Sequence, residues 1–295
     1  MAILIDGKIT AQAIKEELKE KIGSLNKDGK PVPGLVTILV GENPASLSYV
    51  TSKSKSCIEI GMLSKIEKLS SGISEKELLD LIEQYNLDSN YQGILVQLPL
   101  PGHINEQKII ESIDPKKDVD GFHPVNVGKL VTGYSTFYPC TPYGILELLR
   151  RYQIPTSGKH VVVVGRSNIV GKPVANMLVQ KKEGANSIVT VCHSAAKDLT
   201  QFTKSADILI AAIGKANFVT SSMVKEGAVV IDVGINRIED SSTSKGYRIV
   251  GDVDFISVEK IASYITPVPG GVGPMTIAML LKNTYHAYLN FQSGD

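Results

Sequence analysis

The sequence predicts a doubly wound α/β protein of two domains, and three observations carry this prediction. A chain of 295 residues is long enough for two domains that each bury a core. From Leu35 onward, short β-branched runs alternate with segments of helical period, as in parallel α/β structure. Several of these runs are apolar throughout, which is typical of strands that helices cover on both faces.

Composition limits the classes of partner. The chain has 31 Lys and Arg against 30 Asp and Glu, so no broad basic field attracts nucleic acid or an anionic membrane surface. Its apolar runs are far shorter than the roughly 20 residues that span a bilayer. The three cysteines form no C-x-x-C motif or His-rich cluster, so we expect no metal site and a reducing compartment. Because the N-terminus has no signal-like apolar segment, we expect a soluble, cytoplasmic protein.

The first predicted strand, residues 35–40, ends at Gly41, and a helix is expected from about Ala45. Tyr49 and Lys53 lie four residues apart, so their side chains are adjacent on one face of this helix. Short-chain dehydrogenases use a Y-x-x-x-K pair for catalysis, but their glycine-rich turn precedes the pair, whereas here it follows. A lysine beside an aromatic residue on a helix is most often a solvated surface contact. The pair alone therefore does not establish a site.

The next predicted strand, residues 93–98, carries Gln97 near its carboxyl end. Open α/β sheets bind ligands at this end of their strands, although a glutamine there can also simply bond to a loop. Further on, Asp118 and Asp120 stand two residues apart and Gly121 follows them. We expect one of these acids to cap a helix or pair with lysine, and the other to accept from N–H groups of a ligand.

The predicted domain boundary lies near Pro139, where Thr141 can cap a helix over residues 142–152 whose first turn contains Pro142. The following domain is expected to run through strands 160–165, 187–192, 206–214, 228–234 and 247–253. Residues 265–276 contain three prolines and three glycines and should interrupt secondary structure, after which helical period resumes. We therefore divide the chain into domains 1–139 and 140–274 and a C-terminal helix, 275–295.

The turn within VVVVGRSNIVGKPVANML, residues 161–178, has two competing interpretations. As a hydrolase nucleophile elbow, G-x-S-x-G, it would present Ser167, but Ile169 replaces the second glycine. As a dinucleotide fingerprint it begins at Gly165, and its closing glycine, Gly171, comes one residue late. A strand that runs into a helix start near Val170 offers backbone N–H groups and a helix dipole to a pyrophosphate. We favour the phosphate site over the hydrolase and over a turn without a ligand.

Taken together, these segments resemble the bifunctional methylenetetrahydrofolate dehydrogenase/methenyltetrahydrofolate cyclohydrolase family over nearly the full length. The matching motifs are PASLSYVTSK, GILVQLPLP, KDVDGFHPVNVGKL, PCTPYGILELL, VVVVGRSNIVGKP, VTVCHS, VVIDVGIN and ITPVPGGVGPMT. The resemblance implies an N-terminal α/β catalytic domain that the C-terminal helix completes, and a Rossmann-like domain that binds NADP. It also implies a cleft for tetrahydrofolate derivatives, a homodimer, and a role in one-carbon metabolism and purine biosynthesis.

The same resemblance assigns roles to particular residues. It implies that Lys53 is the catalytic lysine, that Tyr49 stacks on the folate ring system, that Gln97 orients Lys53 and that Asp120 binds the pterin N–H edge. The wall beside the substrate would be Pro269, Gly270, Gly271, Val272 and Gly273. The cofactor contacts would be Gly165, Arg166, Ser167, Ser194 and Ile235. The register of Ser194 is open, because the segment that precedes it is longer than is usual in the family.

Elementary chemistry agrees with these roles. Hydride loss from methylenetetrahydrofolate needs two positioned ligands and no nucleophile, because the flanking nitrogens stabilise the cation. Hydrolysis of the methenyl cation needs an activated water, for which a lysine of lowered pKa is suitable. An NADP-dependent reductase of another small carbonyl or imine, with Tyr49 as proton donor, is the alternative. A nucleotide-sensing protein that has lost the chemistry is disfavoured, because Lys53, Gln97 and Asp120 are all present.

Overall fold

The computed structural model describes residues 1–243 and 246–293 and divides the chain into two compact units. The six-stranded unit comprises Met1–Ala11 and Thr141–Thr276, and the three-stranded unit comprises Gln12–Cys140 and Ile277–Asp295. The chain passes from one unit to the other within helices α1 (Gly7–Lys27), α6 (Cys140–Arg151) and α10 (Val272–Ser293).

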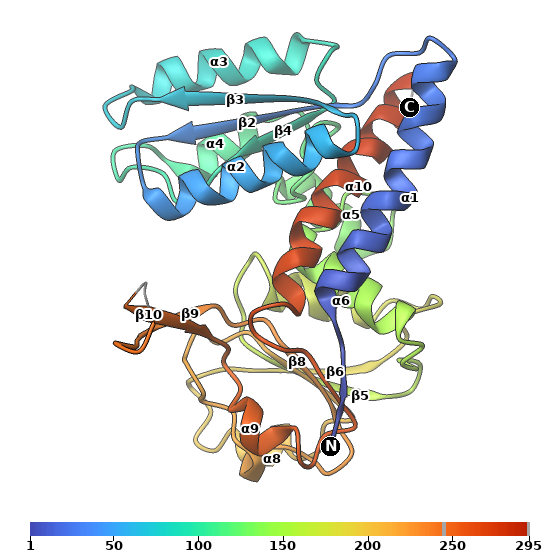
Figure 1. Cartoon of the computed structure of the whole chain (residues 1–295), viewed down its shortest axis with the longest axis vertical. Helices are drawn as coiled ribbons and strands as arrows, with labels where there is room; N and C mark the ends of the chain where they lie inside the picture. Colours follow the sequence, from blue (N-terminus) through green and yellow to red (C-terminus); the bar gives the residue numbers. More distant parts are fainter. Residues whose placement is uncertain (244–245, 294–295) are drawn as a thin grey trace. The chain divides into compact units, whose positions relative to one another are not determined.

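The three-stranded unit contains a parallel sheet of order β3-β2-β4 (Figure 1). Its strands are β2 (Gly34–Val40), β3 (Leu63–Leu69) and β4 (Gly93–Val96). Its shorter helices are α2 (Pro44–Glu59), α3 (Glu75–Leu87), α4 (Glu106–Ser112) and α5 (Pro124–Thr132). Helix α2 packs against β2 and β3, and α3 lies on the opposite side of the sheet. The central strand is therefore covered on both faces.

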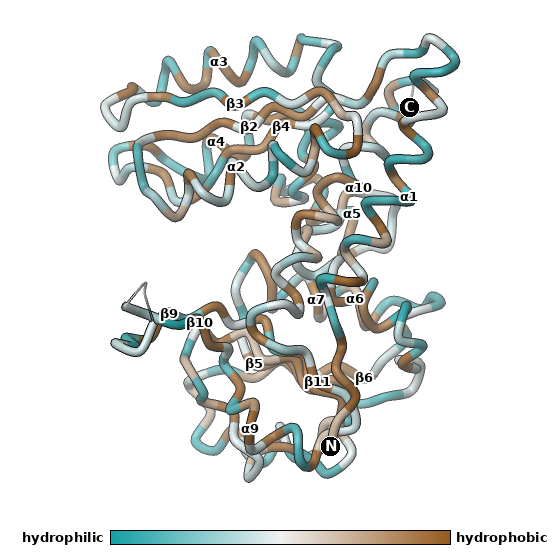
Figure 2. Tube along the Cα trace, viewed as in Figure 1, coloured by the Kyte–Doolittle hydropathy of each residue, from teal (hydrophilic) through white to brown (hydrophobic). Residues whose placement is uncertain are grey.

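Alternation along β2 directs one set of side chains to each face. Val36, Ile38 and Val40 pack in one core cluster with Leu78 and Ile82 of α3. Every residue of β2 is buried, and Figure 2 shows β2 and β4 largely in the brown of apolar residues. This is the burial that an apolar run without alternation predicts for a central parallel strand.

The six-stranded unit contains a parallel sheet of order β1-β11-β8-β7-β5-β6. Its strands are β1 (Ile3–Leu4), β5 (His160–Val164), β6 (Ile188–Cys192), β7 (Ile208–Ala211), β8 (Val229–Asp232) and β11 (Tyr264–Ile265). Between them lie α7 (Gly171–Leu178), α8 (Thr200–Thr203), η1 (Ser221–Met223) and α9 (Phe255–Val258). Strands β9 (Asn236–Glu239) and β10 (Tyr247–Val250) form a separate antiparallel pair.

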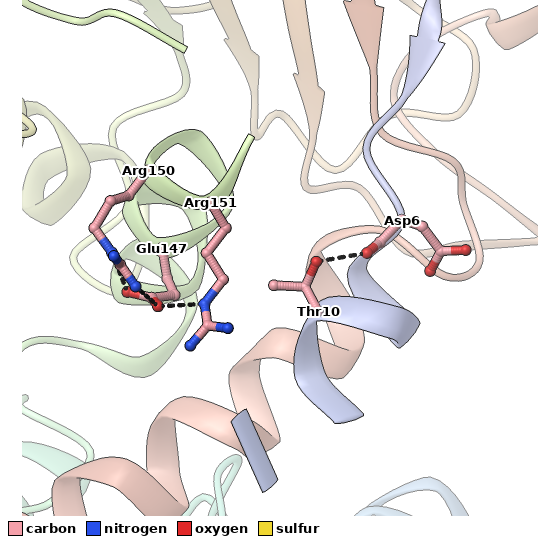
Figure 3. Close-up of polar contacts among 5 residues, drawn as sticks. All are labelled: Asp6, Thr10, Glu147, Arg150 and Arg151. Carbon is pink, nitrogen blue, oxygen red and sulfur yellow. Dashed lines mark hydrogen bonds and ion pairs between the residues drawn. The ribbon is translucent and has the colours of Figure 1, made fainter. Parts of the chain in front are cut away.

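Ionic and capping contacts fix two helix ends in this unit (Figure 3). Glu147 of α6 is only 4% exposed and accepts from Arg150 at 2.6 and 3.2 Å and from Arg151 at 2.7 Å. These charge-assisted bonds offset the cost of burying the carboxylate. Asp6 caps α1, because its Oδ1 accepts from the backbone N–H of Lys8 at 2.8 Å, and its carbonyl accepts from the Thr10 hydroxyl at 2.8 Å.

The fold differs from the sequence expectations at several points. Because β1 pairs with β11, Met1–Ala11 belong to the six-stranded unit. We had expected these residues in the N-terminal domain. The expected strand 247–253 lies in the antiparallel pair and not in the doubly wound sheet. The sequence interpretation also missed β3, in which two polar residues separate each apolar residue, Leu63, Ile66 and Leu69, from the next.

Two helix starts also differ from expectation. Helix α6 begins at Cys140, so Thr141 lies inside it, and its hydroxyl bonds to that of Thr276 at 3.0 Å rather than capping the helix. Helix α10 begins at Val272, earlier than the expected 275, since Pro274 is tolerated in the first turn of a helix.

Candidate active site

Lys53 is the centre of a polar cluster in the three-stranded unit. It belongs to the buried face of α2 and is 5% exposed. Its Nζ donates to Gln97 Oε1 at 3.1 Å and lies 4.5 Å from the centre of the Tyr49 ring. Gln97 follows β4, and its Nε2 donates to the carbonyl of Leu98 at 2.7 Å, which turns the amide oxygen toward Lys53. The structure thus brings together three residues that the sequence proposed for one site.

The surroundings of Lys53 make it a candidate base. Burial lowers the pKa of Lys53, and the nearby carboxylate of Asp120 opposes this effect. A lysine of lowered pKa holds a larger fraction of neutral amine near neutral pH than an exposed lysine, and only the neutral amine accepts a proton. A cation–π contact with Tyr49 further restricts the position of the side chain.

The two neighbouring acids have separate roles. Asp118 is 2% exposed and accepts from the backbone N–H groups of Gly121 at 3.1 Å and His123 at 2.8 Å, and from Asn126 at 2.8 Å. It therefore shapes the loop that leads into α5. Asp120 is partly exposed and is the acid that influences the pKa of Lys53. This arrangement is consistent with the expectation that one acid, here Asp118, is structural and that the other, Asp120, faces a ligand.

Asn283 of α10 holds the same loop from the other side. It is 1% exposed, and its Nδ2 donates to the carbonyls of Val119 at 2.8 Å and Tyr138 at 2.9 Å. Because Val119 precedes Asp120, the C-terminal helix fixes the backbone beside the candidate site. The Cys140 thiol is buried next to it, and burial followed by the Asp120 charge raises the pKa of Cys140 well above its usual range. That thiol remains protonated.

A second cluster lies at the carboxyl edge of the six-stranded sheet. Gly165 follows β5 with φ +134°, and a Cβ there would lie 2.2 Å from the carbonyl oxygen of Ala212. A Cβ on Gly171 would lie 2.3 Å from the carbonyl oxygen of Gly165. The turn therefore needs both glycines, and its late closing glycine still lets α7 approach β5 closely. This close approach of backbone segments fits a dinucleotide fingerprint.

Ser167 has a capping role in this turn. Its Oγ accepts from the N–H groups of Val170 at 3.1 Å and Gly171 at 3.3 Å. These N–H groups are therefore not left for a phosphate, contrary to our expectation for the helix start, but the hydroxyl hydrogen of Ser167 remains a donor. Among the residues that the structure describes, no histidine nitrogen bonds to this hydroxyl, which speaks against the hydrolase interpretation.

The remaining expected cofactor residues lie at or near the same edge. The carbonyl of Cys192, at the end of β6, accepts from Gly165 N–H at 2.9 Å, so Ser194 follows directly beside the turn that carries Arg166. Both Arg166 and Ser194 are exposed. Asp198, the first acid after β6, precedes α8 and accepts from Thr200 N–H at 2.8 Å. The end of β6 therefore carries no acid of the kind that binds the ribose of NAD.

A pocket of about 280 Å³ in the six-stranded unit is lined by the glycine-rich segment and by Ile235, one of the expected cofactor residues. Its lining includes Lys8, Asp232, Ile235 and residues 267–274. A Cβ on Gly7 would lie 1.7 Å from the Gly271 carbonyl oxygen, so the glycine-rich segment packs directly on the start of α1. Ile235 is 67% exposed at this pocket, which suits a surface that a planar ring can cover.

Two buried acids in this unit were missed by the sequence interpretation. Asp232 ends β8, and Asp252 follows β10; they are 3% and 0% exposed. Burial raises the pKa of Asp232 to about 6, although three backbone N–H groups bond to it. An acid directly after the apolar run VVI was the available signal, because a charge at a strand end requires compensation.

Residues 1–243 and 246–293 contain neither a metal-binding cluster nor a membrane-spanning helix. In that part of the chain, no group of three or more His, Cys, Asp or Glu side chains could hold a metal ion. No helix within those ranges combines the length and apolar character needed to cross a membrane. Cys57, Cys140 and Cys192 are buried free thiols.

Family models match both parts of the chain. The model described as "Tetrahydrofolate dehydrogenase/cyclohydrolase, catalytic domain" matches residues 5–120, and "Tetrahydrofolate dehydrogenase/cyclohydrolase, NAD(P)-binding domain" matches residues 139–292. Among curated proteins, "Bifunctional protein FolD" of Chlorobium chlorochromatii is 59% identical over 288 residues, covering 97% of this chain and 98% of the relative.

Solved structures agree with these matches. The bifunctional FolD methylenetetrahydrofolate dehydrogenase/cyclohydrolase of Campylobacter jejuni is 52% identical, with a TM-score of 0.93 over 99% of this chain and all of that one. The Trypanosoma brucei enzyme, complexed with NADP cofactor and inhibitor, is 39% identical, with a TM-score of 0.93 over 99% of this chain and 98% of that one.

Proposed function

The chain belongs to the tetrahydrofolate dehydrogenase/cyclohydrolase family, and from this premise we propose how its residues perform the two reactions of that family. The enzyme oxidises 5,10-methylenetetrahydrofolate to 5,10-methenyltetrahydrofolate with NADP, and then hydrolyses the product to 10-formyltetrahydrofolate. The observation that carries the assignment of residues is the buried Lys53, held by Gln97 and flanked by Tyr49 and Asp120.

Lys53 acts as the base in the hydrolysis. Its neutral amine takes a proton from the water that attacks the methenyl carbon, and the lowered pKa makes this form available. Gln97 holds Nζ in place through the 3.1 Å hydrogen bond, and its own amide is fixed by the Leu98 carbonyl. The protonated lysine then gives its proton to the ring nitrogen that leaves as the ring opens. The hydroxyl proton of the intermediate is lost to solvent as the formyl C=O forms, which accounts for the one proton that hydrolysis of the cation releases.

The remaining residues of both sites bind and orient. Asp120 accepts from the pterin N–H groups, and Tyr49 stacks on the ring system. The wall from Pro269 to Gly273 offers close backbone contact to the substrate. These assignments follow the family resemblance, and the partial exposure of Asp120 and Tyr49 supports them, because both remain accessible to a ligand.

The cofactor residues form the second part of the proposal. When bound, NADP accepts the hydride in the oxidation. Gly165 permits close approach to the pyrophosphate, Ser167 donates its hydroxyl hydrogen to a phosphate oxygen, and Ile235 covers one face of a ring. Arg166 and Ser194 bind the 2′-phosphate, and no acid stands between the end of β6 and Asp198, whose carboxylate bonds to Thr200 N–H.

We also propose that the enzyme is a cytoplasmic homodimer that supplies one-carbon units for purine biosynthesis. Strand β6 is an edge of the six-stranded sheet, and Ile188 and Val191 on it are 65% and 41% exposed. Such an apolar edge is suited to pairing with a second copy. Light scattering of the purified protein should give the mass of a dimer, and Ile188→Lys should lower it toward that of a monomer.

An absorbance assay with methylenetetrahydrofolate and NADP tests the two reactions together. We expect NADPH to form, and added methenyltetrahydrofolate to be hydrolysed faster than in buffer alone. Formation of NADPH without faster hydrolysis would indicate that the protein is a dehydrogenase without cyclohydrolase activity. If NADPH were oxidised with other small carbonyls or imines but neither folate reaction occurred, the alternative reductase would be supported.

A further inference from the structure

We propose that Asp252 is a positioning residue for the cofactor site, a role that rests on the proposed use of NADP. Asp252 is wholly buried, yet its carboxylate touches two segments that meet the carboxyl edge of the sheet. One is the loop after β7, which starts at Ala212. The other begins directly after Ile235. A single buried carboxylate thus connects the segments that follow β7 and β8, and β7 is the neighbour of β5, the strand that leads into the dinucleotide turn.

The hydrogen bonds of Asp252 account for both carboxylate oxygens. Oδ2 accepts from the N–H groups of Ile213 at 2.6 Å and Gly214 at 2.9 Å. Oδ1 accepts from the N–H of Lys215 at 2.9 Å and from Asn236 Nδ2 at 2.9 Å. Four donors around one carboxylate compensate its loss of hydration, and they require the loop to keep one conformation.

The loop that Asp252 holds lies against the dinucleotide turn. The N–H of Ala212 donates to the carbonyl of Val164 at 2.9 Å, and a Cβ on Gly165 would meet the Ala212 carbonyl oxygen at 2.2 Å. A shift of the loop after β7 would therefore displace the turn at Gly165, which is proposed to approach the pyrophosphate. Ligands of open α/β sheets bind at this edge, outside the carboxyl ends of the strands.

Asp232 secures Asp252 in turn. Its Oδ1 accepts from the N–H groups of Gly234 and Asp252, both at 2.9 Å, and its Oδ2 accepts from Val253 N–H at 2.9 Å. A Cβ on Gly251 would lie 1.8 Å from Asp232 Oδ2, so the residue before Asp252 has no room for a side chain there. The two buried acids therefore act together: Asp232 bonds to Gly234, one residue before Ile235, and Asp252 bonds to the loop 213–215.

The test is Asp252→Asn, with Asp254→Asn as the matched control. An asparagine can accept through one oxygen only, and its NH₂ group would face two N–H donors, so the loop must shift. We expect the Kd for NADPH and the KM for NADP to rise about tenfold or more, a loss comparable to one hydrogen bond to a charged group. Asp254→Asn removes the same charge two residues away, at a side chain that makes no cap hydrogen bond, and should leave both values unchanged.

Hydrolysis of methenyltetrahydrofolate without NADP separates positioning from general damage. The residues assigned to this reaction include Lys53, in the three-stranded unit, so Asp252→Asn should keep the rate within about twofold of the parent while cofactor binding weakens. Should Asp252→Asn not fold, Asn236→Ala removes one donor to Oδ1 and should raise the Kd about threefold.

An unchanged Kd for NADPH in the folded variant, or equal losses in cofactor binding and in hydrolysis, would overturn the role of Asp252. Failure of the proposed function would look different. The parent would then hydrolyse no methenyltetrahydrofolate and reduce no NADP, whichever residue stood at position 252.

Discussion

Replacing Gln97 by glutamate tests how the pKa of Lys53 controls hydrolysis. The change places a carboxylate about where Oε1 now accepts from Nζ at 3.1 Å. At that distance two unit charges attract by about 5 kcal/mol at an effective dielectric constant near 20, equivalent to about 4 pKa units. The new carboxylate also loses hydration, so we expect the pKa of Lys53 to rise by about 1 to 3 units.

The sign of the effect on rate follows from the protonation state. Hydrolysis requires the neutral amine, so at a pH below the raised pKa each unit of increase lowers the active fraction about tenfold. The rate of Gln97→Glu should therefore fall at neutral pH and recover at higher pH. Gln97→Leu should shift the rising part of the pH–rate profile to lower pH, because it removes a hydrogen bond that stabilises the charged lysine.

The assay is the decrease in methenyltetrahydrofolate absorbance between about pH 6 and 9, corrected for uncatalysed hydrolysis. Hydride transfer needs no base, so NADPH formation at saturating substrates should change less than hydrolysis does. Superimposable pH profiles for the parent and both Gln97 variants would show that Lys53 is not the titrating base.

Three further variants test other parts of the proposal. Arg166→Ala should lose most of a preference for NADP over NAD, about 10- to 100-fold in kcat/KM, and an unaltered preference would remove Arg166 from the 2′-phosphate site. Gly171→Ala should weaken NADPH binding more than tenfold and destabilise the fold by about 1–3 kcal/mol, measured by titration and by urea unfolding, because its Cβ would lie 2.3 Å from the Gly165 carbonyl oxygen. Asp120→Asn should raise the folate Kd about tenfold, through weaker bonds to the pterin N–H groups, and equal folate binding in parent and variant would argue against that contact.

The sequence predicted the strands of highest apolar content and missed those whose stability depends on context. Strands β2, β4, β5, β7 and β8 are buried at nearly every position, and their apolar runs indicated this. Strand β3 is one of the two edge strands of its sheet, and its residues Lys65, Glu67 and Lys68 obscure the apolar pattern. The two-residue strands β1 and β11 depend on pairing with β8 and with each other, which no local pattern indicates.

The candidate site was predictable where the chemistry lies in short motifs. The spacing of Tyr49 and Lys53 indicated that they share a helix face, and the structure adds the contact of Lys53 with Gln97. The contacts of Asp252 join residues far apart along the chain, so spacing alone could not indicate them. Ser167 shows the remaining difficulty, because a capping serine and a phosphate-binding serine have the same local sequence.

The most direct measurement of the central claim is the rate at which Lys53→Met hydrolyses methenyltetrahydrofolate. Methionine preserves most of the volume of the buried side chain but cannot accept a proton, so folate and NADP should still bind. We predict that the enzymatic rate falls to that of buffer at every pH between about 6 and 9, because no other base replaces the amine. Hydrolysis at the parental rate by the folded variant would contradict the account.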